Sequence, residues 1–563
     1  MILDCETNGL KPSVIWCVVV KHNGEVHEFT DQVAFKAFLV QNPNERVYAH
    51  NGLNYDYPVL ERLWGVCWDG FDLRDTLVLS RLYNPSLPGG HSLKAWGERL
   101  GFPKGDYSDW SCFTPEMLKY CVQDVLVTEK LLEKIGDPEV YASELEFKVA
   151  EIMGQQEDDG WLLDQGLCWE VLGGLKERKM ALEEEVHRRF KPLATFVREI
   201  TPRFKQDGTM SVVGLKFLAE PMDVAGVFTR IEYPEFNLGS RQQIGRYLKR
   251  FGWEPKTFTE TGQAIVDEKV LEGVSVPEAQ LIAEYLMVEK RVAMIQSWLD
   301  NVGDDGRVHG RVNPIGAVTG RMTHYTPNVA QVTAKGKPYG DIMRQCWHVG
   351  PGRKLVGMDA SGLELRVLAH YMNDKDYLEE VLNGDIHTAN RLAAGLTTRD
   401  QAKTFIYAFL YGAGDAKIGS IIGETSEGGK RLKAKFLANT PSLKSLRDRV
   451  STAARRGWLK GLDGRRIVVR SPHAALNTLL QGGGAVVMKE AMVLVHERAK
   501  ELNVDFMQVG NIHDELQFDT AAKDVILMKE AAEWGMEQAG VKLGLRCPMK
   551  GDVNIGDHWG ETH

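Results

Sequence analysis

The stretch VGNIHDELQFD, residues 509–519, constrains the fold of this chain more than any other feature. Ile512, Leu516 and Phe518 are the apolar positions of a strand-like run, and Asp514 and Glu515 interrupt it with two adjacent acids. Ionising a carboxylate beside a buried strand costs free energy unless its charge is compensated. The run is therefore either a loop that resembles a strand or a place where carboxylates meet a cation. The rest of the sequence has to decide between these two readings.

Length and composition predict a multidomain globular protein. At 563 residues the chain is long enough for roughly three or four domains. It contains no run of about 18 uninterrupted apolar residues, so no membrane span is predicted. The opening MILDCETNGL carries acids and no basic leader, which argues against a secretory signal. The eight cysteines are scattered without a C-x-x-C pair, a pattern that favours core thiols in a reducing cytoplasm over disulfides or a zinc site.

The net charge of −9 does not exclude a nucleic-acid partner, because the charge is unevenly distributed. Residues 1–150 hold 22 acidic and 14 basic side chains, whereas the rest of the chain is close to neutral. Within that remainder the segment 428–449, GGKRLKAKFLANTPSLKSLRDR, concentrates seven basic residues. Such a run is either a solvated helix face or a track for phosphates.

The distribution of strand and helix patterns divides the chain into consecutive regions. The segment VIWCVVVKHNGEVHEFT is typical of a hairpin with Asn23-Gly24 at its turn, and helical segments follow as far as residue 138. Residues 139–300 are mostly helical, with long amphipathic runs at 166–190 and 278–300. Between these runs, 190–236 is irregular and rich in Pro, Gly and Thr, which suggests the tip of an arm. From residue 301 onward strands and helices alternate.

A first set of carboxylates lies within the first 125 residues. Asp4 and Glu6 in ILDCET are two apart on a predicted strand, so both side chains point to the same face. Asp56 follows a turn in AHNGLNYDYPVL, and Tyr120 and Asp124 in YCVQD lie four apart on one helix face. Each piece alone is a common chance pattern. Together, four carboxylates and a tyrosine can hold two divalent metals, the arrangement that activates water for phosphodiester cleavage.

A second set of carboxylates includes those of residues 509–519. KLVGMDASGLELRVLAHYM, residues 354–372, begins as a strand that ends near Asp359 and turns into a helix, with Glu364 predicted about one and a half turns inside it. Taken alone, Asp359 is equally a helix-terminal acid stabilised by the helix dipole. If Asp359 and Asp514 lie on neighbouring strands, however, both can bridge two Mg²⁺ ions about 3.5–4 Å apart, and the metals relieve the burial of their charges.

The segment TTRDQAKTFIYAFLYGAG, residues 397–414, predicts a helix with one chemically distinct ridge. Arg399, Lys403, Tyr407 and Tyr411 are spaced four apart and therefore fall along one side of it. Two cations followed by two aromatics suit a triphosphate and then a sugar and base, and His387 upstream can add a phosphate contact. An ordinary amphipathic helix explains the same spacing. A P-loop is excluded because G-x-x-x-x-G-K-[ST] does not occur.

The order and spacing of these motifs resemble two known groups. D-x-E, N-x-x-x-x-D and Y-x-x-x-D resemble the DEDD-type 3′–5′ exonucleases with a tyrosine in their third motif. DASGLELR, RDQAKTFIYAFLYG and IHDE resemble motifs A, B and C of the family A (Pol I-like) DNA polymerases. NPIGAVTGRMTH (313–324) and SPHAALNTLLQGGGA (471–485) resemble two further segments of that family. The greatest likeness is to replicative polymerases of short-tailed, podovirus-type bacteriophages.

The exonuclease resemblance implies a role for each matching residue. It implies that Asp4, Glu6, Asp56 and Asp124 bind metal and that Tyr120 positions the attacking water.

The polymerase resemblance does the same for the rest of the chain. It implies that Asp359 and Asp514 ligate two Mg²⁺ ions, for which Mn²⁺ can substitute, and that Lys403 both holds the triphosphate and protonates the pyrophosphate. Glu364 would exclude a ribose 2′-hydroxyl. The implied nucleotide contacts are His387, Arg399, Lys403, Tyr407 and Tyr411. The implied DNA contacts are Arg321, His473, Asn477, Gln481 and His513.

The resemblance also implies partners, and two departures from it matter here. Primer–template DNA and dNTPs are the expected substrates, and a helicase-primase and a single-strand-binding protein are further possible partners. The phage group recruits host thioredoxin as a processivity factor, but those relatives carry a longer, more basic insertion than residues 190–236 provide. His473 replaces an arginine of many bacterial relatives, which puts one template contact in doubt.

The sequence therefore predicts an α/β multidomain protein with an RNase H-like DEDD exonuclease domain followed by a right-hand polymerase domain. The predicted domains are the exonuclease at 1–138, a helical thumb at 139–300 with its tip at 190–236, palm at 301–385 and 466–563, and fingers at 386–465. The predicted location is the cytoplasm of a phage-infected bacterium. Competing hypotheses are a nuclease whose C-terminal part only binds DNA, a single-subunit RNA polymerase, and a structural DNA-binding protein.

Overall fold

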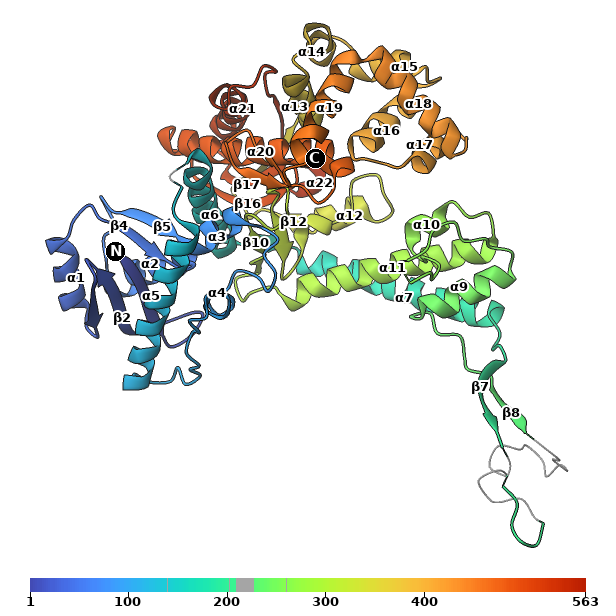
Figure 1. The fold of residues 1–563 in the computed structure, drawn as a ribbon, viewed down its shortest axis with the longest axis horizontal. Coiled ribbons are helices and arrows are strands. Elements are labelled where there is room, and N and C mark those ends of the chain that lie inside the picture. Colours follow the sequence, from blue (N-terminus) through green and yellow to red (C-terminus); the bar gives the residue numbers. More distant parts are fainter. Residues whose placement is uncertain (139, 202, 209–226, 260) are drawn as a thin grey trace. The chain divides into compact units, whose positions relative to one another are not determined.

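The structure is a computed structural model, which describes residues 1–138, 140–201, 203–208, 227–259 and 261–563 (Figure 1). It divides into two compact units. The first combines Met1–Asp164 with Asn301–His563, and the second is Gln165–Asp300. The mixed α/β content expected from the sequence is confirmed.

The N-terminal part of the first unit is built on a five-stranded sheet in the order β3-β2-β1-β4-β5. The predicted hairpin is confirmed: β2 and β3 pair antiparallel, and Asn23 and Gly24 both have the positive φ that such a tight turn requires. β4 and β5 continue the sheet in parallel with β1. The elements are β1 (Ile2–Thr7), β2 (Ile15–His22), β3 (Glu25–Phe29), α1 (Gln32–Gln41), β4 (Arg46–Ala49), α2 (Asp56–Trp64), β5 (Asp72–Asp75), α3 (Thr76–Tyr83), α4 (Leu93–Leu100) and α5 (Pro115–Ile135).

The C-terminal part of the first unit is built on a four-stranded antiparallel sheet in the order β16-β17-β13-β18. The strands are β13 (Arg353–Ala360), β16 (Phe506–Ile512), β17 (Glu515–Ala521) and β18 (Gly551–Gly556). The helices that pack around this sheet and its neighbours are α13 (Leu363–Met372), α14 (Lys375–Leu382), α20 (Ala475–Glu501), α21 (Val525–Lys542) and α22 (Trp559–Thr562).

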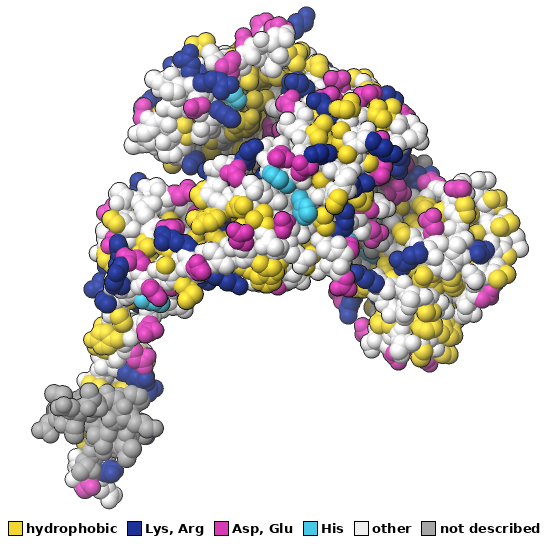
Figure 2. Space-filling view, turned by 180° about the vertical axis from the view of Figure 1, so that it is seen from behind, with side chains coloured by type: hydrophobic (Ala, Val, Ile, Leu, Met, Phe, Trp, Pro, Cys, Tyr) yellow, Lys and Arg dark blue, Asp and Glu magenta, His cyan; other side chains and the backbone are white. Residues whose placement is uncertain are grey.

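A cluster of helices lies between α14 and α20 in the sequence. It comprises α15 (Ile386–Ala394), α16 (Arg399–Leu410), α17 (Asp415–Ile421), α18 (Ser426–Asn439) and α19 (Pro441–Ala454), followed by the short hairpin β14 (Trp458–Lys460) and β15 (Arg466–Val468). Further small elements of the first unit are β6 (Trp161–Leu163), β9 (Arg307–Val308), β10 (Arg311–Asn313), β11 (Thr323–Tyr325), α12 (Gly340–Gln345) and β12 (Trp347–His348). The basic run 428–449 falls on α18 and α19. Figure 2 shows basic and acidic side chains interspersed over the visible face of the molecule.

Helix α20 passes through the core and fixes the position of α13 beside it. A Cβ atom at Gly483 of α20 would lie 2.7 Å from Val367 Cγ1 of α13, so the close approach of the two helices needs a glycine at that position. By length and composition, Pro472–Glu501 is apolar enough to cross a membrane, but its most apolar window is 94% buried inside the fold. Packing within the core therefore accounts for its apolar sequence.

Helix α6 (Tyr141–Asp159) is held in the first unit by buried charge. Glu146 is fully buried and forms ion pairs with Lys489 of α20 and, at 2.6 Å, with Arg465. Leaving one of these charges buried without its partner would cost several kcal/mol, so the three side chains hold their elements together. This helix belongs to the first compact unit, and the second begins at Gln165. The domain boundaries expected from the sequence remain a prediction.

A chain of buried amides links α6, β16 and α20. His496 donates from Nε2 to Gln508 Oε1 at 3.0 Å, Gln508 donates to Gln156 at 2.9 Å, and Gln156 donates to Asn511 at 3.1 Å. Burial lowers the pKa of His496 to about 4. The imidazole is therefore neutral in the folded protein under conditions in which an unfolded chain already protonates it.

We expect His496→Gln to flatten part of the pH dependence of stability. Between pH 7 and pH 5 this histidine becomes protonated in the unfolded chain but stays neutral in the folded protein. The unfolding free energy of the wild type should therefore fall by about 2 kcal/mol over this range because of His496. Glutamine keeps the donor to Gln508 and cannot titrate. Urea unfolding of both proteins at the two pH values, followed by tryptophan fluorescence, measures the difference. Equal losses in the two proteins would contradict this account.

The second unit contains two long helices that lie side by side, α7 (Gln165–Arg189) and α11 (Pro277–Asp300) (Figure 1). They match the predicted amphipathic runs. α9 (Arg241–Arg250) and α10 (Glu268–Glu272) pack against α11. The segment 190–236 is more regular than predicted, because β7 (Thr195–Ile200) and β8 (Phe228–Glu232) form an antiparallel ribbon. Within the predicted tip, residues 202 and 209–226 lie outside the described residues.

Candidate active sites

The second carboxylate set comes together at one end of the four-stranded sheet. Asp359 is the penultimate residue of β13, and its Cα pairs with Glu515 of the adjacent β17. Asp514 lies in the two-residue turn between β16 and β17, and its carbonyl accepts a hydrogen bond from the Ala360 amide at 2.9 Å. The segment 509–519 therefore contains both a turn and a carboxylate site. The β16–β17 hairpin lies beside β13, as the sequence required, although Asp514 lies in the turn of the hairpin and not on a strand.

Burial and mutual repulsion shape the electrostatics of these two acids. Burial, followed by the nearby charge of Asp514, raises the pKa of Asp359 to about 6. Burial, followed by Glu364, also raises the pKa of Asp514. Carboxylates that resist ionisation in each other's company gain most from a bound cation, which compensates both charges at once.

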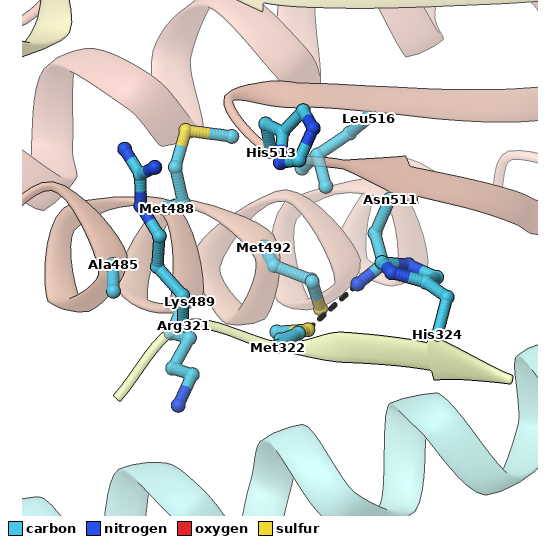
Figure 3. A pocket seen from close by; sticks show the side chains of 10 residues that line it. All are labelled: Arg321, Met322, His324, Ala485, Met488, Lys489, Met492, Asn511, His513 and Leu516. Atoms are coloured by element: carbon cyan, nitrogen blue, oxygen red, sulfur yellow. Dashed lines mark hydrogen bonds between the residues drawn. The ribbon is translucent and has the colours of Figure 1, made fainter. Parts of the chain in front are cut away.

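The turn that carries Asp514 has an unusual backbone. His513 adopts φ 57°, in the left-handed region that a side chain other than glycine occupies rarely and at some cost. Its exposed ring lines a small pocket with side chains from residues 321–324 and from α20 (Figure 3). In this pocket Asn511 donates to the Met322 sulfur. Arg321 and His513, two predicted DNA contacts, are thus brought together from segments almost 200 residues apart.

Glu364 is held in place from two sides. α13 begins at Leu363, so Glu364 lies in the first turn of the helix and not one and a half turns inside it as expected. Its side chain is nearly buried, and Oε1 accepts hydrogen bonds from the Tyr411 hydroxyl at 3.0 Å and from Arg321 at 3.1 Å. These contacts fix one carboxylate oxygen beside the predicted nucleotide ridge.

The predicted ridge lies on α16, whose N-terminus is stabilised by a capping box between Thr398 and Gln401. Arg399, Lys403 and Tyr407 follow one another along the helix, and Tyr411 is its C-terminal capping residue. The Tyr407 and Tyr411 rings lie 6.3 Å apart, and the His387 ring lies 6.2 Å from Tyr407. Arg399 forms an exposed ion pair with Asp385 at 2.8 Å. The structure thus brings five of the six predicted nucleotide-binding side chains to α16 and the adjacent α15, and the sixth, Glu364, contacts Tyr411 from α13.

The remaining predicted DNA contacts lie at the start of α20. His473 is exposed on a single 3₁₀ turn before the helix, and Asn477 and Gln481 are half-buried within it.

One feature of this site was not evident in the sequence. Glu515, directly opposite Asp359, is buried and accepts hydrogen bonds from the Trp559 indole and Gln517. Its second oxygen lies 2.7 Å from His563 Nδ1. Both carboxylate oxygens of Glu515 therefore already have partners within the protein. No local pattern could have signalled this, because Trp559 and His563 are more than 40 residues away.

The first carboxylate set lines a separate cleft of about 370 Å³ in the N-terminal part. Asp4 and Glu6 lie on β1, as predicted, and Asp56 begins α2. Tyr120 and Asp124 lie on α5, also as predicted. The Cys5 amide donates to Asp56 Oδ1 at 3.0 Å, which ties α2 to β1. The structure therefore assembles all five sequence-predicted residues at one cleft.

The charges in this cleft are densely packed. Burial first and then neighbouring acids raise the pKa of Asp4 and of Glu6. Burial also raises the pKa of Asp56 and of Asp124 to about 6. Cys121 lies within reach of Asp4 and Glu6, and burial raises the pKa of its thiol well above its usual range.

A basic side chain, that of Lys104, also lines this cleft. Lys104 forms an ion pair with Asp124 Oδ2, and its ammonium lies 4.7 Å from the centre of the Tyr120 ring. Burial alone would lower the pKa of Lys104, but the ion pair with Asp124 outweighs burial and raises it. The other oxygen, Asp124 Oδ1, is buried and has no hydrogen-bond partner among the residues that the structure describes. No motif in the sequence marks Lys104, which lies in a loop.

Both sites fit hard divalent cations such as Mg²⁺. Their donors are carboxylate oxygens, the ligand type that Mg²⁺ prefers. The orphaned Asp124 Oδ1 lacks the partner that a buried carboxylate oxygen requires, and a cation in the cleft would satisfy it. At the other site, the raised pKa values of Asp359 and Asp514 reflect the same shortage of compensating charge.

Comparison with known proteins decides the family. Residues 217–561 match the family described as DNA polymerase family A. The chain belongs to DNA polymerase family A. It is 36% identical to the DNA-directed DNA polymerase of Enterobacteria phage T3 over the full length of both chains. It is also 36% identical to that of Escherichia phage T7, over 91% of this chain and 92% of the relative. The predicted family and its phage type are therefore confirmed.

A solved structure of low sequence identity supports the fold. The polymerase domain of Pol1 from M. smegmatis, in complex with DNA primer-template and dNTP, superposes with a TM-score of 0.78 and 19% identity. The superposition covers 97% of this chain and 93% of that one. At this identity the likeness shows the fold of a family A polymerase and nothing finer.

Proposed function

We propose that this family A polymerase extends a DNA primer on a template with dNTPs and removes nucleotides from the primer 3′ end, in the replication of a phage genome. The observation that carries the proposal is the presence of two carboxylate clusters in separate parts of one chain. In each cluster, burial raises the pKa of the acids, so a bound cation would stabilise their charged forms. Full-length identity with phage polymerases supports the assignment of the substrates. The predicted domain roles, with the exonuclease at 1–138, belong to this proposal.

Divalent metal ions, two per site, would supply charge stabilisation for the attacking and leaving oxygens of in-line phosphoryl transfer, and Mn²⁺ can replace Mg²⁺. At the polymerase site, Asp359 and Asp514 would hold them. Arg399, Lys403 and His387 would orient the triphosphate, and Lys403 would also protonate the departing pyrophosphate. Tyr407 would pack on the sugar and base, as its place on the α16 ridge suggests.

The DNA contacts belong to the same proposal. Arg321, Asn477 and Gln481 would donate hydrogen bonds to acceptors in the minor groove of the primer–template. These acceptors lie at the same positions in each base pair, so the shape of a pair is checked without its sequence being read. His513 would lie beside the primer end, because its turn also carries Asp514. His473 would contact the template backbone, and its exposure is compatible with that role.

At the exonuclease site, the residues divide between binding and orientation. Asp4, Glu6, Asp56 and Asp124 would hold the metals, and Tyr120 would orient the attacking water. Host thioredoxin, a helicase-primase and a single-strand-binding protein stay predictions. The ribbon of β7 and β8 lies in the segment expected to contact a processivity factor, together with residues outside the described ones.

The direct test incubates the full chain with Mg²⁺ and a 5′-labelled primer–template, with and without dNTPs. Extension with dNTPs and shortening without them is the expected result. Extension with NTPs in place of dNTPs would favour an RNA polymerase. Shortening under both conditions would favour a nuclease whose C-terminal part only binds DNA.

We expect Glu364→Ala to weaken discrimination against ribonucleotides by about tenfold or more. The carboxylate fixed by Tyr411 and Arg321 occupies space beside the nucleotide ridge, and its removal frees room for a 2′-hydroxyl. The measurement is the ratio of kcat/KM for dNTP and NTP on one template. Tyr411→Phe, which removes one of the two hydrogen bonds, should give a smaller change in the same direction. An unchanged ratio in Glu364→Ala would contradict the assignment.

A further inference from the structure

The loop between α4 and α5 places Lys104 in the exonuclease cleft through several independent backbone anchors. A Cβ atom at Gly97 of α4 would lie 2.8 Å from the Lys104 backbone nitrogen, so the loop passes against the helix where only glycine leaves room. Gln123 of α5 donates to the Pro103 carbonyl at 2.8 Å, and Trp16 of β2 donates to the Trp110 carbonyl at 3.1 Å. The position of Lys104 is therefore built into the fold.

The Lys104 side chain is directed at two residues of the proposed site. Its ammonium pairs with Asp124 Oδ2 and lies over the Tyr120 ring. The Lys104 side chain is 22% exposed and that of Asp124 is 3% exposed, so this contact is screened far less than a surface ion pair. With Oδ2 held by the ammonium, the partnerless Oδ1 is the atom of Asp124 left for a metal.

We propose that Lys104 is a positioning residue of the exonuclease site, which orients Asp124 and Tyr120 and opposes the binding of divalent cations at the same carboxylates. This inference rests on the proposed exonuclease function. The two parts of the role have opposite consequences. A fixed positive charge beside the metal ligands weakens metal binding, because it repels the cation and already compensates part of the carboxylate charge. The same charge improves turnover by holding the acid and the tyrosine in one geometry.

The proposal gives Lys104→Met a distinctive pair of effects. Methionine approximates the length of the lysine stem without its charge. We expect Mn²⁺ to bind the exonuclease site about tenfold more tightly and the turnover of single-stranded DNA to fall about tenfold. A lysine that only supports the fold would change metal affinity in the other direction, because a disordered site binds metal less well. Lys104→Arg keeps the charge and should retain the weak metal binding of the wild type.

Metal affinity is measured on the full chain in a background carrying Asp359→Asn and Asp514→Asn, which removes the competing polymerase site. Free Mn²⁺ is followed by electron paramagnetic resonance, without any substrate. Turnover is measured separately on single-stranded DNA with the polymerase site intact. The matched control is Lys94→Met, because Lys94 is 65% exposed and pairs only with exposed Asp106 at 3.4 Å. Neither quantity should change in that control.

The outcomes separate this inference from the proposed function. Unchanged or weaker Mn²⁺ binding in Lys104→Met overturns the role of Lys104, whatever the wild type does to DNA. Tighter binding with unchanged turnover removes the positioning part. A wild type that binds Mn²⁺ at this site but never shortens DNA overturns the exonuclease function, while the metal titration still tests Lys104. Primer extension serves as the folding check, and Lys104→Gln replaces the methionine variant if that check fails.

Discussion

Asp359→Ala should reduce primer extension by about a thousandfold or more while leaving the shortening of single-stranded DNA unchanged. Asp359 on β13 and Asp514 in the β16–β17 turn are brought together by the pairing of β13 with β17. Burial raises the pKa of both carboxylates. A metal at such a site contributes several kcal/mol of charge stabilisation, and each 1.36 kcal/mol corresponds to a factor of ten in rate. Loss of one of the two carboxylates that would hold the metals should therefore remove most of the catalytic effect.

The measurement is single-turnover incorporation of one dNTP on a labelled primer–template. Asp514→Ala should have an effect of similar size, and the two losses should not add, because both residues serve one site. The matched control is Asp557→Ala: this acid follows β18, is 64% exposed and pairs with Lys354 at 2.7 Å, a contact of little energetic value. If Asp359→Ala extends primers normally, the assignment of the polymerase site is wrong.

Asp4→Ala should abolish the shortening of DNA, again by about a thousandfold, without slowing extension. Asp4 shares its cleft with Glu6, Asp56 and Asp124, and the Coulombic repulsion among them raises its pKa further after burial. The alanine variant removes one of these repelling charges, so the protein should lose no stability at neutral pH. Unaltered unfolding midpoints would show that lost activity comes from the site and not from misfolding.

This second effect is measured as the rate at which a 5′-labelled single strand is degraded from its 3′ end in Mg²⁺. Asp109→Ala is the matched control, since Asp109 is an exposed acid in the loop that carries Lys104 and bonds only locally to Ser111. Retained degradation in Asp4→Ala would exclude this cleft as the exonuclease site. Loss of extension in the same variant would instead indicate that the two sites depend on each other.

Local sequence patterns alone determined much of each proposed site. The two-residue period of a strand placed Asp4 and Glu6 on one face of β1, and the helical period placed Tyr120 beside Asp124 on α5. The same rule set the ridge of α16, and Asn23-Gly24 set the first hairpin. These patterns can be read from the sequence because they depend on neighbours within a few residues, whose geometry the backbone fixes.

Only the tertiary structure decided which of these pieces meet. Asp124 joins Asp4 across 120 residues, and Asp514 joins Asp359 across more than 150, because burial of the surrounding apolar side chains brings their strands and helices together. Lys104 gave no signal in the sequence, since its place depends on the clearance at Gly97 and on anchors from α5 and β2. Glu515 is adjacent to Asp514 in the sequence, yet its two oxygens are bonded to Trp559 and His563. Non-local contacts of this kind depend on packing and on the pairing of buried charge, which no local period encodes.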